Sequence, residues 1–328
     1  MLIVKTPYRF SLYGGGLDYP DWYNNNNTKV LCAGLDYYCY QTVRRLPPFF
    51  LHKHRAAYSK IELVNDFSEF EHPAIREILK HFQYESGIEI SHVGDLPARS
   101  GIGSSSAFSV GLILALHALK GQYISRTDLA LQAIKLEQGS MGEDVGFQDQ
   151  CASAFGGLVL IETENGQIIP RKFITSSDYL KYFEDSILLG YDGTPRYSGN
   201  TSKITKASIR DDSNSPFLNE LTDICNDGIT QFSKMADISK HAQLTKLSRD
   251  IKLRLSNKLS DSYTQDLITT TEKAGSLCTR VMGAGGGGFF VCMAPSYKHS
   301  SIKSSLPSIK IWANLRISSS GSQVIYFD

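Results

Sequence analysis

Three consecutive serines at the start of an apolar segment are the first residues in this sequence that could do chemistry. Ser104, Ser105 and Ser106 follow a glycine-containing turn at residues 101–103 and precede an almost wholly apolar run at residues 107–119. The first N–H groups of a helix lack partners within it, and the helix dipole adds partial positive charge, so this end binds anions. Serine hydroxyls can also donate to phosphate or bind a hard cation. The segment predicts a polyphosphate site; the simpler alternative is a serine N-cap on a core helix.

A glutamate on an apolar helix face is the second candidate. Glu137 shares one stripe with Leu129 and Ala133 in a helix predicted over residues 125–139. It also falls in the last turn, where the helix dipole disfavours an anion. A carboxylate placed in this way needs a cation. Mg²⁺ bound to a phosphate chain is one candidate, and a lysine or arginine partner is the alternative.

A lone carboxylate among neutral residues is the third candidate. Asp149 lies between two glutamines in "GFQDQCASAFGG", twelve residues after Glu137. An acidic group in such a setting can act as a general base or orient a substrate hydroxyl. It could equally cap the short helix that "QCASAF" predicts.

The late string "GAGGGG", residues 283–288, matches GxGxxG and raises the question of a dinucleotide site. A strand follows it where a dinucleotide site needs a helix, and no acidic residue follows about twenty positions later. The string therefore favours a hairpin tip that is pressed against a ligand or another backbone segment. The sequence also lacks the GxxxxGK[ST] pattern of P-loop proteins.

Strands and helices alternate without the regular order of a doubly wound sheet, which favours an α+β fold. Side-chain periodicity and composition predict the individual elements. The expected strands and hairpins are residues 2–13, 28–46, 87–96, 155–170, 186–192 and 277–294. The expected helices are residues 69–87, 107–119, 125–139 and several between about 200 and 275.

Length and composition limit the class of protein. A chain of 328 residues exceeds a comfortable single core, so two domains sharing one cleft are expected, with a boundary near the polar stretch 173–185. A net charge of +1 is too balanced for a protein dedicated to nucleic acid. The six cysteines show neither disulfide nor zinc spacing, and no signal peptide or membrane span is recognised. These features predict a cytoplasmic enzyme with no nucleic-acid or membrane partner, and they leave a homo-oligomer open.

Three motifs, in order, resemble those of the GHMP kinases, small-molecule kinases named for galactose, homoserine, mevalonate and phosphomevalonate. They are "TPYRFSLYGGGLDYP", "LPARSGIGSSSAFS" and "MGAGGGGFF". The resemblance implies an α+β, two-domain kinase that uses ATP and Mg²⁺. Residues 1–175 would form the N-terminal ATP-binding domain, and residues 176–328 would form a ferredoxin-like C-terminal domain.

The resemblance also implies roles for single residues. Asp149 would be the catalytic base with Arg9 as its electrostatic partner, and Glu137 with Ser104 or Ser105 would hold Mg²⁺. The implied ATP-binding residues are Arg99, Ser100, Gly101, Ile102, Gly103, Ser104, Ser105 and Ser106. The implied substrate-binding residues are Gly15, Gly16, Asp18, Asp149, Arg196, Gly285 and Gly286.

Within the family, the sequence is most similar to bacterial kinases of D-glycero-D-manno-heptose 7-phosphate. "GGGLDYPDWY", "GFQDQCASAFGG", "DGTPRYSGNTSKI" and the four-glycine tip carry this similarity. It implies phosphorylation of the anomeric hydroxyl of a phosphosugar. Gly15 and Gly16 stand where galactokinase-like members have Glu-His, which argues against galactose. The alternatives are a fucose-type sugar 1-kinase, a kinase-like sensor without turnover, and an NAD-dependent enzyme.

Such a substrate carries its own phosphate, which arginine recognises well. Three places in the sequence offer an arginine for this contact: Arg44 with Arg45, Arg99 in the serine turn, and Arg196, which Lys203 follows closely. Arg196 follows a Gly-Thr-Pro turn where the two domains are expected to meet. The sequence therefore favours Arg196 as the contact for the substrate phosphate.

Overall fold

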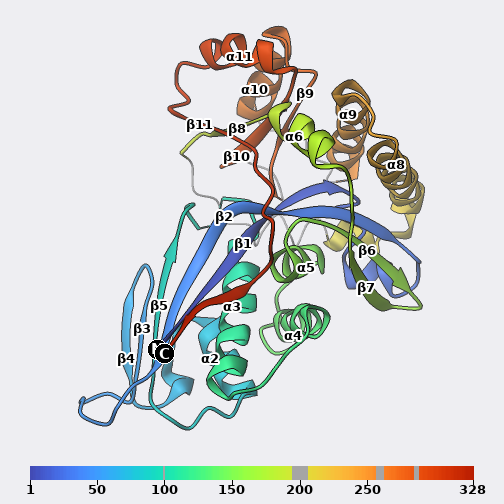
Figure 1. Ribbon diagram of the computed structural model, residues 1–328. Coiled ribbons are helices and arrows are strands. Elements are labelled where there is room, and N and C mark those ends of the chain that lie inside the picture. The colour runs from blue at the N-terminus through green and yellow to red at the C-terminus, as the bar shows by residue number, and fades with distance from the viewer. Residues whose placement is uncertain (99, 194–205, 256–261, 284–287) are drawn as a thin grey trace.

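The fold is built from two β-sheets with helices packed on them (Figure 1). The computed structural model describes residues 1–98, 100–193, 206–255, 262–283 and 288–328. The described helices are α1 (Pro20–Tyr23), α2 (Pro73–His81), α3 (Ser104–Leu119), α4 (Arg126–Gln138), α5 (Gln148–Phe155), α6 (Ser177–Asp185), α8 (Ser215–Ser233), α9 (Ile238–Leu255), α10 (Ser262–Lys273) and α11 (His299–Ser305). None of these helices combines the length and apolar character that crossing a membrane requires.

The first sheet has eight strands in the order β12-β1-β2-β5-β3-β4, and β6 joins β2 and carries β7. Its strands are antiparallel except for the parallel pair β3 and β5. They are β1 (Leu2–Tyr13), β2 (Lys29–Arg45), β3 (His54–Ala57), β4 (Ile61–Val64), β5 (Ile88–Gly94), β6 (Leu158–Glu164), β7 (Gln167–Lys172) and β12 (Gln323–Phe327). Helices α3 and α5 pack on β1 and β2, so the predicted serine turn and the predicted base both meet the same two strands.

The second sheet has four antiparallel strands in the order β11-β8-β10-β9. The strands are β8 (Ile187–Tyr191), β9 (Cys278–Val281), β10 (Phe289–Met293) and β11 (Ile311–Asn314). Numbered from β8, this order is 4-1-3-2, with helices between the first and second strands and between the third and fourth. That is the ferredoxin-like arrangement, so the expected α+β fold class with a ferredoxin-like C-terminal part is confirmed.

The end of the chain returns to the first sheet. Strand β12 pairs with β1, with Phe327 opposite Leu2, and Figure 1 shows the two termini side by side. The sequence patterns did not predict this strand, and it places the last residues outside the ferredoxin-like sheet. The domain boundary at residues 175/176 stays a prediction. Helix α6 follows that point, and the first strand of the second sheet begins at Ile187.

Helix α3 is buried on nearly every side because its residues are almost all apolar or small. Ten of its sixteen residues are buried, from Ser106 to Leu116. Its neighbour α4 begins at the N-cap Ser125, whose side chain accepts a hydrogen bond from Asp128 N. The packing of α4 on α3 brings the C-terminal end of α4 to the serine turn.

Candidate active site

The serine turn begins α3 without a side-chain cap. The N-cap residue is Gly103, in the left-handed conformation with φ of 72°, and the first helical hydrogen bond runs from Ala107 N to Gly103 O over 3.0 Å. The three serines are therefore the first three residues of α3 rather than its cap. Because no side chain caps this end, the positive end of the helix dipole there would favour an anion.

Other residues assigned to the turn point into the protein. Ser100 is 1% exposed and donates from its hydroxyl to Pro97 O over 2.6 Å, and Ile102 is 0% exposed. Ser105 is exposed and Ser104 partly so, whereas Ser106 is buried. Of the four serines in this turn, only Ser104 and Ser105 have side chains that reach solvent. Ser100 and Ile102 are buried, so they could contact ATP only through their backbone atoms.

The base of the glycine hairpin packs on this turn. A Cβ on Gly101 would lie 2.7 Å from Met282 O, and a Cβ on Gly288 would lie 2.9 Å from Ser100 O. Phe289 N also donates to Ser100 O over 3.3 Å. The interpretation of a hairpin pressed against another backbone is confirmed at these positions. Gly101 is needed for this contact rather than only for the approach of a ligand.

Arg9 and Asp149 form an ion pair beside the turn. Arg9 Nε donates to Asp149 Oδ1 over 2.6 Å, and the second nitrogen of the fork, Nη2, donates to Oδ2 over 3.0 Å. Strand β1 fixes the arginine, since Arg9 N donates to Ile102 O over 2.8 Å. Asp149 lies in the first turn of α5, whose N-cap, Phe147, has no side-chain cap. The alternative that Asp149 serves as the cap of this helix is therefore not what the structure shows.

The aspartate also touches the serine turn directly. A Cβ on Gly103 would lie 2.8 Å from Asp149 Oδ2. Only glycine tolerates both that contact and the positive φ of 72°. The carboxylate of Asp149 thus sits against the backbone that begins α3, where a terminal phosphate would be held.

Asp18 lies in the same region but is almost enclosed. It is 1% exposed, and its Oδ1 accepts a hydrogen bond from Gly16 N over 2.8 Å. Burial raises the pKa of Asp18, and the nearby negative charge of Asp149 raises it further. The hydrogen bond from Gly16 lowers this pKa, but its effect is smaller than that of burial. The space beside Gly16 is open, with no atom within 4 Å of a Cβ placed there. The structure thus brings Gly16, Asp18 and Asp149 together and leaves room at Gly16.

Glu137 is buried at the end of α4, as the apolar stripe predicts. It is 1% exposed, and its Oε2 accepts hydrogen bonds from Ser106 Oγ over 2.8 Å and from Gln150 Nε2 over 2.5 Å. Burial raises its pKa to about 7, although Ser109, Ser106 and Gln150 act in the opposite direction. The serine that contacts Glu137 is thus Ser106, while the roles of Ser104 and Ser105 stay predictions.

The residues around Glu137 fit a magnesium ion. Its Oε1 is buried and has no hydrogen-bond partner, and no lysine or arginine of the described residues forms an ion pair with it. Carboxylate and hydroxyl oxygens are the ligands that Mg²⁺ prefers. Across the described ranges, no three His, Cys, Asp or Glu side chains cluster as a metal site, so the protein would supply few ligands itself. That suits an ion held largely by phosphates.

Two basic residues that the sequence patterns missed complete the region. A Cβ on Gly15 would lie 3.3 Å from Lys252 Nζ, which comes from α9. Arg280, on β9, donates from Nη2 to Ser11 O over 2.5 Å. The ferredoxin-like part thus places two cations beside β1. Lys252 lies in a helix whose charge pattern resembles an ordinary surface, and Arg280 is the one charged residue of its strand.

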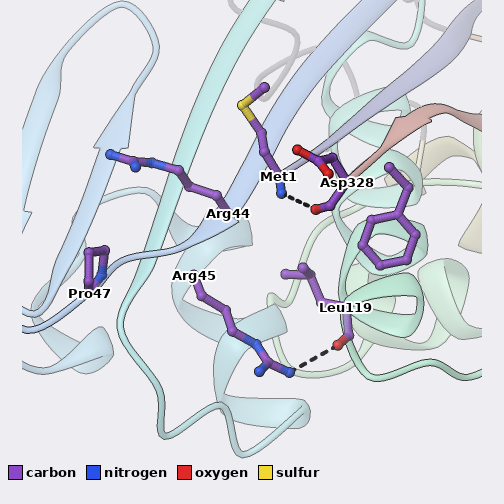
Figure 2. A pocket seen from close by; sticks show the side chains of 7 residues that line it. Met1, Arg44, Arg45, Pro47, Leu119 and Asp328 are labelled. Carbon is purple, nitrogen blue, oxygen red and sulfur yellow. Dashed lines mark hydrogen bonds between the residues drawn. The ribbon is translucent and has the colours of Figure 1, made fainter.

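The remaining arginine candidates fall elsewhere. Arg44 and Arg45, at the end of β2, line a pocket together with Leu119, the last residue of α3 (Figure 2). The serine turn lies at the other end of α3. Arg44 is paired with Glu89, and Arg45 donates to Leu119 O over 3.3 Å. Met1, Arg44, Arg45, Pro47, Leu119, Phe327 and Asp328 line this pocket. Arg99, Arg196, Lys203, Gly285 and Gly286 lie outside the described residues, so their assigned roles stay predictions.

Known proteins share both the motif region and the fold. Residues 69–157 match the family "GHMP kinases N terminal domain". The mevalonate kinase of Thermococcus onnurineus is 26% identical over 64% of this chain, and the chain spans only 60% of its length. The D-glycero-alpha-D-manno-heptose 7-phosphate kinase of Campylobacter jejuni is 25% identical over 92% of this chain and 91% of its own.

The likeness extends to solved structures. A D-glycero-D-manno-heptose 1-phosphate kinase from Bacteroides thetaiotaomicron superposes with a TM-score of 0.79 at 19% identity, covering 100% of both chains. At that identity the superposition shows the fold alone. The chain therefore has the fold seen in GHMP kinases, and its residues 69–157 match the N-terminal domain of that family.

Proposed function

We propose that the protein transfers a phosphoryl group from ATP to the anomeric hydroxyl of D-glycero-D-manno-heptose 7-phosphate, giving the 1,7-bisphosphate. The observation that carries this proposal is the Arg9–Asp149 pair, held 2.6 Å apart beside the uncapped N-terminus of α3. The choice of sugar is supported by the Campylobacter relative, which aligns over nearly the whole chain. The mevalonate kinases align over a shorter part.

Asp149 would receive or orient the proton of the attacking hydroxyl. Its two oxygens are fixed by the fork of Arg9, so the carboxylate has one orientation relative to the serine turn. Phosphoryl transfer depends on alignment and charge stabilisation more than on covalent chemistry. A carboxylate held rigidly against the phosphate-binding backbone supplies the alignment.

The N-terminus of α3 would bind the phosphates of ATP through its N–H groups and through the hydroxyls of Ser104, which is partly exposed, and Ser105, which is exposed. Glu137, with one of these hydroxyls, would hold Mg²⁺, which when bound neutralises charge on the phosphate chain. Ser106 and Gln150 orient the Glu137 carboxylate and leave its Oε1 free for that ion. We place this activity in the cytoplasm, where ATP is available, with no nucleic acid as partner.

An ADP-release assay over a substrate panel tests the proposal. The panel contains heptose 7-phosphate, unphosphorylated heptose, L-fucose and mevalonate, each with ATP and Mg²⁺. We expect the largest kcat/KM with heptose 7-phosphate. A larger kcat/KM with L-fucose or mevalonate would show that the assignment of heptose 7-phosphate as the substrate is wrong. ATP binding without turnover of any sugar would favour the sensor function.

A further inference from the structure

Two basic side chains from the ferredoxin-like part lie beside the loop that follows β1. Lys252 Nζ lies 3.3 Å from the position of a Cβ on Gly15, and Arg280 Nη2 donates to Ser11 O over 2.5 Å. Helix α9 and strand β9 pack against each other, which brings the two residues to one place. Neither residue is matched by a sequence motif.

Neither of these two residues forms an ion pair with another of the described residues. Arg9 uses its guanidinium fork on Asp149, whereas Arg280 donates from Nη2 to a backbone carbonyl. Arg280 Nε is buried and has no hydrogen-bond partner among the described residues. Within the described ranges, Lys252 has neither an ion pair nor a side-chain hydrogen bond. Partly buried cations without an ion-pair partner are costly, so the chemistry of this place suits an anion.

The mutual repulsion of the cations supports this view. Burial lowers the pKa of Lys252 to about 8, and the nearby charge of Arg280 lowers it further. Burial also lowers the pKa of Arg280, and Arg9 acts in the same direction. Asp18 is the carboxylate that favours the charged form of Lys252. A dianion bound between the two side chains would relieve both effects.

Neutral hydrogen-bond donors surround the same spot. A Cβ on Gly15 would lie 3.0 Å from Ser11 Oγ and 3.5 Å from Gln148 Nε2, so both lie near Lys252 Nζ. Gln148 Oε1 is buried and accepts no hydrogen bond from the described residues. Gln148 directly precedes Asp149, which links this basic place to the reacting end of the site.

We propose that Lys252 and Arg280 bind the phosphate group that the sugar substrate already carries. This assignment rests on the proposed function and names the part of the site that selects a phosphorylated sugar. Arginine pairs two oxygens of a phosphate at once, and lysine adds a compact charge. Anchored there, the substrate would extend past the open space at Gly16 toward Asp149.

The phosphate could also come from ATP, but the geometry favours the substrate. The uncapped end of α3 meets Asp149 at Gly103, which touches the carboxylate. Lys252 lies instead at Gly15, in the loop that leads to Gly16 and Asp18. The two sources are distinguished by whether KM changes for the sugar or for ATP.

The kinetic test compares Lys252→Met with Lys240→Met, which removes an exposed lysine from the same helix. We expect Lys252→Met to raise KM for heptose 7-phosphate by about tenfold or more, with little change for ATP or unphosphorylated heptose. Arg280→Lys, which keeps the charge but loses the fork, should raise the same KM by a smaller factor. Equal losses with both sugars, or a raised KM for ATP alone, would overturn the proposal.

A second measurement does not depend on activity. Inorganic phosphate should raise the melting temperature of the wild type and of Lys240→Met more than that of Lys252→Met, because ligand binding to the folded state stabilises it. If the wild type turns over no phosphorylated sugar while this difference is present, the proposed reaction fails and the anion site stands. If Lys252→Met is protected by phosphate as well as the wild type is, the anion site itself is wrong.

Discussion

Gly103 and Asp149 are in such close contact that a Cβ on the glycine would lie 2.8 Å from Oδ2 of the aspartate. This contact joins the start of α3 to the start of α5 and sets the distance between the predicted phosphate site and the predicted base. Arg9 binds the same carboxylate through both of its oxygens. The position of Asp149 is therefore determined by contact with the backbone at Gly103 and by the guanidinium of Arg9.

The first prediction concerns Gly103→Ala. Gly121→Ala is a matched control, because Gly121 also has a positive φ, 67°, but no atom within 4 Å of its Cβ position. Both variants should lose about 1–3 kcal/mol of unfolding free energy through backbone strain. Only Gly103→Ala should also displace Asp149 and lower kcat, by about 10²-fold. Equal kcat in the two variants, measured at saturating substrates, would show that the contact does not position the base.

The second prediction is that Asp149→Asn lowers kcat by about 10²- to 10⁴-fold, the usual effect of removing a general base. ATP binding, measured by calorimetry, should be retained because the start of α3 is unchanged. Asp178→Asn, an exposed aspartate in α6, is the control. Near-normal turnover of purified Asp149→Asn would remove this residue from the mechanism.

The third prediction is that Glu137→Gln raises the Mg²⁺ concentration needed for half-maximal activity, because a neutral amide is a poorer ligand for a hard cation. Without Mg²⁺ this variant should be at least as stable as the wild type, since the carboxylate is buried and its Oε1 has no partner. Glu85→Gln, an exposed site, serves as the control. An unchanged Mg²⁺ titration would mean that Glu137 has only a structural role.

The fourth prediction concerns pH. The pKa of Lys252 is about 8 in the folded protein, below its ordinary value near 10.5, so between these values the unfolded chain binds more protons. The unfolding free energy of the wild type should therefore rise from pH 8 to 10.5 relative to that of Lys252→Met. The charged groups that act on Lys252 are Arg280, Asp18 and Arg9, together with Cys225, whose pKa burial raises to about 12.

The same titration should weaken phosphate protection above pH 8, because the cation is lost. Urea unfolding of the wild type and Lys252→Met at several pH values measures both effects. A stability difference that does not change with pH would contradict the lowered pKa of Lys252.

Local patterns predicted the parts of the site that depend on a single helix or turn. The apolar stripe through Leu129 and Ala133 was enough to predict that Glu137 is buried, because helical periodicity alone places it inward. The excess of glycine and serine at the start of α3 likewise marked the predicted phosphate site.

Long-range packing supplied what the patterns could not. Which serine meets Glu137 depends on how α4 lies on α3, and the structure selects Ser106. Lys252 belongs to a polar helix whose charges look like a solvated face until β9 and β1 pack against it. Strand β12 pairs with a strand more than three hundred positions earlier, so no local signal announces it.

The most direct test of the account is the position of the transferred phosphate. Heptose 7-phosphate, ATP and Mg²⁺ are incubated with the wild type or with Asp149→Asn, and the products are followed by ³¹P NMR with proton coupling. We expect a new phosphate resonance coupled to the anomeric proton, formed by the wild type and almost absent with Asp149→Asn. A phosphate on another hydroxyl, or no transfer to this sugar while another substrate is phosphorylated, would contradict it.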